Sequence, residues 1–111
     1  MENDLVAWGR VARIVTRGRV TGHSAQATVG FVEQADGSLL VAASSPRADW
    51  ALNLIAEPRC RIAIADVSRV VVARPLEGAA YAAAIRELIL KYGTPAEGLG
   101  AGPAFELTPE R

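Results

Sequence analysis

The dipeptide Asp36-Gly37 constrains the fold of this chain more than any other feature of the sequence. It separates two apolar runs, residues 24–34 and 38–43. Asp-Gly between two such runs is a strong local signal for a tight β-hairpin. We therefore predict two antiparallel strands joined at this turn.

The rest of the chain predicts more strands, two helices and a short helical arm. The run 11–16 is a strand that ends in the Gly-rich turn 17–22, so three strands follow one another at the start of the chain. A helix capped by Ser45 or Asp49 ends before Pro58. The remaining predicted elements are a short helical arm within 1–10, strands over 59–65, 67–74 and 104–108, and a second helix over 77–92.

The predicted order is β-β-β-α-β-β-α-β, which is an α+β class that is mainly β. Hairpins dominate and βαβ units are scarce, so an antiparallel barrel with attached helices fits better than a doubly wound sheet. The 111 residues suffice for a single domain spanning 1–111.

Composition excludes several function classes. Twelve basic residues balance twelve acidic ones, so the chain has no overall charge that would hold nucleic acid or a membrane surface. One cysteine and one histidine are too few for a disulfide framework or a cysteine-cluster metal site. The sequence has no recognisable targeting segment and no membrane-spanning apolar run, so we expect a cytoplasmic protein without an integral membrane segment.

The first third of the chain is locally cationic. No acid occurs between Asp4 and Glu33, and Arg17 and Arg19 flank the start of the Gly-rich turn. Guanidinium groups beside exposed turn amides can hold a phosphate or a carboxylate. An ordinary solvated strand end explains the same charges. The turn matches neither a Walker loop nor GxGxxG.

A second polar segment, 44–50, joins a strand to the predicted helix. Small hydroxyl side chains at a helix start can leave backbone amides open to a polar ring edge, although a simple capping turn accounts for them too. The other polar residues carry weaker signals. His23 has no sequence partner for a metal or triad role, and Cys60 is predicted to be buried and inert. We expect Asn53 and Pro58 to be structural, with Asn53 bonded to turn backbone.

Taken in order, four segments resemble the deazaflavin-dependent nitroreductase/quinone reductase family, whose members are split β-barrels that bind coenzyme F420. The resemblance covers roughly residues 11–108, and its most specific part is the spacing Trp50-x-x-Asn53-(x)4-Pro58. The four segments are Val15-Thr16-Arg17-Gly18-Arg19-Val20-Thr21-Gly22, Leu40-Val41-Ala42-Ala43-Ser44, Asp49-Trp50-Ala51-Leu52-Asn53-Leu54 followed by Glu57-Pro58-Arg59, and Pro103-Ala104-Phe105-Glu106-Leu107-Thr108-Pro109.

The resemblance implies an F420H2-dependent oxidoreductase that passes a hydride to a quinone, a nitro compound or a similar electron-poor small molecule. In such an enzyme the deazaflavin carries the hydride, which agrees with a chain that offers no acid–base pair, nucleophile or metal site. No catalytic side chain is assigned. The implied cofactor-binding residues are Arg17, Arg19, Thr21, Gly22 and His23 at the phosphate end, and Thr28, Ser44, Ser45 and Trp50 nearer the ring.

The chain also departs from the family pattern. Relatives usually have Lys in place of His23 and an Arg-Thr-Pro-like segment in place of 26–28. The thinner cation set keeps a second hypothesis open, a non-catalytic split barrel that binds FMN, a haem-like ligand or a lipid. Family habit implies a possible homodimer, with an apolar interface from Trp8 or the strands within 59–74.

Overall fold

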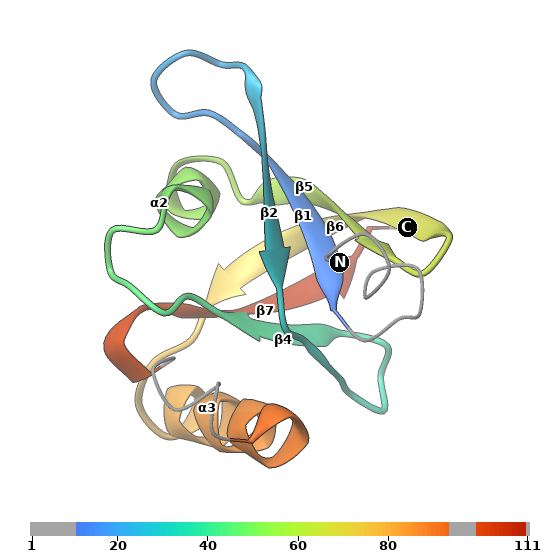
Figure 1. Ribbon diagram of the computed structural model, residues 1–111, viewed down its shortest axis with the longest axis vertical. Helices are drawn as coiled ribbons and strands as arrows, with labels where there is room; N and C mark the ends of the chain where they lie inside the picture. The colour runs from blue at the N-terminus through green and yellow to red at the C-terminus, as the bar shows by residue number, and fades with distance from the viewer. Residues whose placement is uncertain (1–10, 94–99, 111) are drawn as a thin grey trace.

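The computed structural model describes residues 11–93 and 100–110, so the helical arm predicted within 1–10 and Trp8 lie outside the described residues. Seven antiparallel strands form one sheet in the order β2-β1-β5-β6-β7-β4-β3, which curls into a half-barrel (Figure 1). The predicted α+β antiparallel class is confirmed. The strands are β1 (Ala12–Arg17), β2 (Ser24–Val29), β3 (Val32–Glu33), β4 (Leu39–Ala42), β5 (Arg59–Ile64), β6 (Val67–Pro75) and β7 (Ala104–Pro109), and the helices are α2 (Asp49–Ala56) and α3 (Gly78–Tyr92).

The predicted strand 24–34 is wrong as a single element, because the chain breaks into β2 and β3 at Gly30 and Phe31. The end of α3 takes the backbone groups that a neighbouring strand would otherwise use. The Phe31 amide donates to the Tyr92 hydroxyl at 2.9 Å, and the Phe31 carbonyl accepts from Lys91 Nζ at 2.7 Å. A Cβ at Gly30 would lie 2.9 Å from the Tyr92 ring. Contact with α3 therefore adds one strand to the predicted order.

The hairpin at Asp36-Gly37 is present. Gly37 has a φ of +88°, and the strands on either side pair with Val32 opposite Leu40. The Asp36 carboxylate accepts a hydrogen bond from the Ser38 amide at 2.9 Å, an Asx arrangement that closes the turn. Hydrogen bonds from Ser38 lower the pKa of Asp36, so the turn retains its charge.

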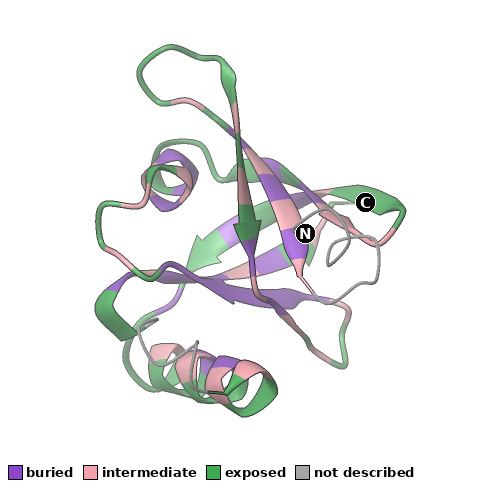
Figure 2. Ribbon diagram, viewed as in Figure 1, coloured by how far each residue is buried: buried purple, intermediate pink, exposed green. Residues whose placement is uncertain are grey.

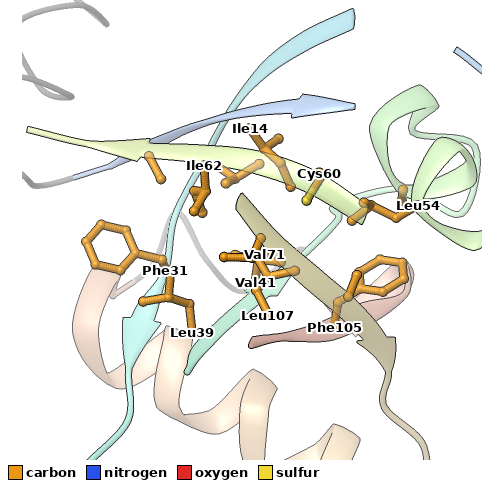
Figure 3. Packing of buried hydrophobic residues seen from close by; sticks show 14 of the residues in the cluster. Ile14, Phe31, Leu39, Val41, Leu54, Cys60, Ile62, Val71, Phe105 and Leu107 are labelled. Atoms are coloured by element: carbon orange, nitrogen blue, oxygen red, sulfur yellow. The ribbon is translucent and has the colours of Figure 1, made fainter. Parts of the chain in front are cut away.

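Two apolar clusters hold the domain together, and α2 and α3 each cover one of them (Figure 2). The larger cluster fills the curl of the sheet, where Ile14, Leu54 and Phe105 come from β1, α2 and β7 (Figure 3). The smaller cluster lies under α3 and includes Leu88. Every residue of β4 is buried because this strand faces both clusters. Cys60 is buried as predicted, and burial raises the pKa of its thiol to about 11.

The start of α2 differs from the predicted cap. Ala48 occupies the N-cap position and offers no side-chain hydrogen bond. The Ser45 hydroxyl accepts from the Arg47 amide at 3.1 Å, so Ser45 closes a turn before the helix. Asp49 is the first helical residue, where its carboxylate complements the positive end of the helix dipole.

Candidate functional site

The Gly-rich turn between β1 and β2 has a closed backbone conformation. The Gly18 amide donates to the His23 carbonyl and the Gly22 amide donates to the Gly18 carbonyl, both at 2.8 Å. Gly22 has a φ of +77°, and a Cβ at Gly18 would lie 2.9 Å from the His23 oxygen. The Thr21 hydroxyl accepts from the His23 amide at 3.2 Å. Both glycines are therefore required by this turn, for different reasons.

One buried amide joins this turn to α2. Asn53 is 2% exposed, and its Oδ1 accepts from the Arg19 backbone amide at 3.2 Å. The same oxygen accepts from Arg19 Nη1 at 2.8 Å, while Asn53 Nδ2 donates to Thr16 Oγ1 at 3.1 Å. Asn53 thus contacts the turn backbone, as the sequence predicts. The sequence did not predict that it also holds the Arg19 guanidinium.

The Arg19 side chain points toward α2 and is only partly free. Its Nη2 lies 3.4 Å from Asp49 Oδ1, and its Nη1 lies 3.4 Å from the Asp49 carbonyl oxygen. The Arg19 side chain is 32% exposed and the Asp49 side chain 83% exposed. The guanidinium is consequently oriented by a buried residue on one side and by an exposed carboxylate on the other.

A cleft of about 270 Å³ opens between the turn and α2. Two donors that line it, the amides of Val20 and Thr21, have no partner among residues 11–93 and 100–110. This donor set is suited to an anion. Arg17 and Gly22, which the sequence also predicts for the site, do not line the cleft, and the Arg17 guanidinium lies beside Gly22. The cleft is lined by Gly18, Arg19, Val20, Thr21, His23, Ser24, Ala25, Asp49 and Asn53.

The predicted ring-side residues do not line this cleft. Ser44 and Ser45 lie on the loop between β4 and α2, where a Cβ at Gly102 would lie 2.8 Å from the Ser45 carbonyl oxygen. Trp50 is half-buried against the larger cluster, with its ring centroid 6.0 Å from that of Phe105. Ser45 and Trp50 therefore lie beside the start of β7, and Ser44 is exposed.

Thr28 lies on the other face of the sheet. It is paired with Arg13 across β1 and β2, and side chains along a strand alternate between faces. Its neighbour Ala27 packs against the larger cluster inside the curl, so Thr28 faces outward. The structure separates Thr28 from the residues around the turn.

A larger hollow, of about 470 Å³, lies between α3 and the strands β3, β4, β6 and β7, and the sequence did not predict it. Glu106 at its edge accepts from Arg74 Nη2 at 2.8 Å and from Gln34 Nε2 at 2.9 Å. The hydrogen bond from Arg74, with that from Gln34, lowers the pKa of Glu106. Arg74 and Glu106 lie opposite each other on β6 and β7, so this ion pair links two neighbouring strands of the sheet.

The chain resembles known proteins both in sequence and in fold. Residues 7–95 match the model of the F420H2-dependent quinone reductase family. The chain belongs to this family. Its fold is similar to that of a solved F420H2-dependent reductase, FDR-A, with 21% identity, a TM-score of 0.75, and coverage of 88% of this chain and 93% of that one. No curated protein sequence matches the chain.

Two other solved structures have the same fold. The haem storage protein HutZ from Vibrio cholerae has 19% identity and a TM-score of 0.77, over 98% of this chain and 87% of that one. A protein described as a domain-swapped dimer has 19% identity and a TM-score of 0.74, over 95% and 92% of the two chains. Likeness at this level of identity establishes the split-barrel fold only.

The strands predicted to form an apolar dimer interface expose both charged and apolar side chains. Arg59 and Arg61 are exposed on β5, and Arg59 Nε is paired with Glu110 at 2.8 Å. The exposed large apolar residues of β6 are Val67 and Val72. Within the described part of the chain, no helix combines the length and hydropathy that a membrane crossing requires.

Proposed function

We propose that this protein is an F420H2-dependent reductase of quinones, nitro compounds or similar electron-poor small molecules. The observation that carries the proposal is the oriented guanidinium of Arg19 in a cleft beside the Gly-rich turn, within the part of the chain that matches the family. The deazaflavin cofactor, when bound, supplies the hydride. The chain's own residues bind and orient the cofactor and the substrate and exclude water.

The donors around the cleft fit the anionic part of such a cofactor. Arg19, Thr21 and His23 line the cleft and would hold the phosphate. Gly22 and Arg17 do not line it and are assigned to the phosphate end on family resemblance, with Arg17 beside Gly22. A guanidinium that is already held by a neighbour loses little further freedom when it binds an anion, which favours affinity. Ser44, Ser45, Trp50 and Thr28 are assigned to the ring side on family resemblance.

Reduction of a quinone or nitro group needs protons as well as hydride. Asp49 is the one acid among the described residues that line the cleft, and it is paired with Arg19. This arrangement favours protonation of the product by water. The protein then acts chiefly by holding cofactor and substrate in register.

A second candidate function is non-catalytic binding of a haem-like ligand, FMN or a lipid. It is supported by the similarity to a haem storage protein and by the exposed position of His23, the single histidine of the sequence, at the cleft. Neutral imidazole is a common axial ligand of haem iron.

Visible-absorption titrations separate the two functions. Purified protein is titrated with oxidised F420, FMN and haemin in parallel, and F420H2 oxidation is then followed with menadione as acceptor. The proposal predicts saturable binding of F420 and acceptor-dependent loss of F420H2. Saturable binding of haemin or FMN, with no response to F420, would favour the second candidate.

We also propose that the protein acts in the cytoplasm and can form a homodimer, as the domain-swapped neighbour suggests. Gel filtration over a range of protein concentrations tests the second point. Elution as a monomer at every concentration would contradict it.

A further inference from the structure

We propose that Asp49 competes with the ligand anion for Arg19 and so sets the affinity and selectivity of the cleft. The inference rests on the proposed function in taking F420 as the physiological ligand. It adds to that function a role for Asp49, which contacts Arg19 and whose negative charge opposes binding of an anion. The ligand class it selects for is a phosphoryl group.

The two terminal nitrogens of Arg19 have different side-chain partners, and Nη1 also lies 3.4 Å from the Asp49 carbonyl oxygen. Nη1 lies 2.8 Å from Oδ1 of Asn53, which is buried and also bonded to Thr16. Nη2 lies 3.4 Å from Oδ1 of Asp49, which is longer than the usual 2.7–2.9 Å of a charge-assisted hydrogen bond. Asn53 therefore fixes the guanidinium, while Asp49 makes a loose contact.

The Asp49 carboxylate is also free to leave. Its side chain is 83% exposed, and it is the first residue of α2, so rotation away from Arg19 places it in water. Exposed ion pairs of this kind contribute little to stability. A ligand anion can thus take the Nη2 position without disturbing the bond between Arg19 and Asn53.

The charge of Asp49 opposes an anion in the cleft. It is the one acid among the described residues that line the cleft. Two unit charges about 4 Å apart in water interact strongly enough to change a dissociation constant about fivefold. A carboxylate ligand would merely exchange with Asp49, whereas a phosphoryl group offers further oxygens to the free amides of Val20 and Thr21. The competition therefore favours phosphoryl groups over carboxylates.

The test compares wild type with Asp49→Asn, which keeps the side-chain shape and removes the charge. Oxidised F420, inorganic phosphate and acetate are titrated separately at low salt, and thermal midpoints confirm folding. We expect Asp49→Asn to bind F420 and phosphate about threefold to tenfold more tightly and to bind acetate detectably. Glu77→Gln, an exposed acid beside the start of α3, makes the same change in net charge and should leave all three affinities unaltered.

A double-mutant cycle ties the effect to Arg19. In the Arg19→Ala background the gain from Asp49→Asn should largely disappear, because the contested nitrogen is absent. The inference would be overturned if Asp49→Asn raised the affinity equally in the Arg19→Ala background. It would also be overturned if wild type bound F420 and Asp49→Asn bound it no more tightly. Either result would leave the proposed function intact. Tighter phosphate binding by Asp49→Asn without F420 binding by any variant would support the inference and contradict the proposed function. Failure of every variant to bind either anion would contradict both.

Discussion

The two helices are attached to the sheet in different ways. At the α3 end, Tyr92 and Lys91 bond to the backbone of Phe31, and the Tyr81 hydroxyl lies 2.6 Å from the Gly102 carbonyl oxygen. At the α2 end, Asn53 holds the Arg19 guanidinium, and the second guanidinium nitrogen meets only an exposed carboxylate. The α3 contacts are made to main-chain groups that cannot move away. The α2 contacts include one that a ligand can replace, so we assign stability to the first junction and binding to the second.

The largest expected effect is at the α3 junction. Leu88 is fully buried in the smaller cluster. Leu88→Ala removes that packing and leaves a cavity, and should lower the free energy of unfolding by about 2–5 kcal/mol. Urea denaturation measures the loss. The F420 affinity of the protein that remains folded should be unchanged, and a parallel loss of affinity would break the division between the two junctions.

A smaller loss is expected at the turn, together with a loss of binding. In Gly18→Ala the new methyl group would lie 2.9 Å from the His23 carbonyl oxygen, so the backbone of the turn must shift. We expect a cost of about 1–3 kcal/mol in stability and weaker F420 binding. Gly37→Ala is the control for strain at a turn glycine outside the cleft, because its φ of +88° disfavours alanine although a Cβ there would meet no neighbour. Equal F420 affinity in both variants would exclude the turn from the site.

Tyr92→Phe tests the α3 junction by removing a hydrogen-bonding group in place of apolar packing. It removes the hydroxyl that accepts from the Phe31 amide, and Lys91 remains bonded to the Phe31 carbonyl. The loss in stability should be about 1–2 kcal/mol, since the hydroxyl also donates to the Phe31 carbonyl at 3.2 Å, so two hydrogen bonds are removed while the packing of the ring is kept. Denaturant titration and F420 titration of the same preparation check that stability falls while affinity does not.

A pH-dependent effect concerns Cys60, which is buried in the larger cluster. Burial raises the pKa of its thiol to about 11 from 9.0, so the folded protein holds the proton more tightly than the unfolded chain. The stabilisation is complete below pH 9 and is lost as the pH rises toward 11. The thermal midpoint of wild type should therefore decline more steeply over this range than that of Cys60→Ala. Parallel curves would contradict the assigned burial.

The parts of the fold that depend on residues close together in the sequence were predictable. The hairpin at Asp36-Gly37 and the helix 77–92 follow from turn chemistry and apolar spacing within a few residues. The break at Gly30 and Phe31 was not predictable, because it is caused by Tyr92, which bonds to Phe31 from 61 positions further along the chain. The absence of a side-chain cap on α2 likewise depends on where Ser45 turns before the helix.

The same distinction applies to the candidate site. The Gly-rich turn and its arginines could be predicted from local charge and glycine content. The partner of Arg19 could not, since Asn53 lies 34 positions away and is brought there by the packing of α2 on β1. Thr28 is an instructive case, because its inward neighbour Ala27 already indicates by strand alternation that Thr28 faces outward.

The central claim is that Arg19, held by Asn53, binds the anionic part of the cofactor. F420 is titrated into wild type, Arg19→Ala and Arg86→Ala at low and at high salt, with Arg86 serving as an exposed arginine on α3 away from the cleft. We predict that Arg19→Ala weakens binding by about 1.5–3 kcal/mol, roughly tenfold to a hundredfold, and that the loss shrinks at high salt. Arg86→Ala should bind as wild type does. Equal F420 affinity in wild type and Arg19→Ala would contradict the account.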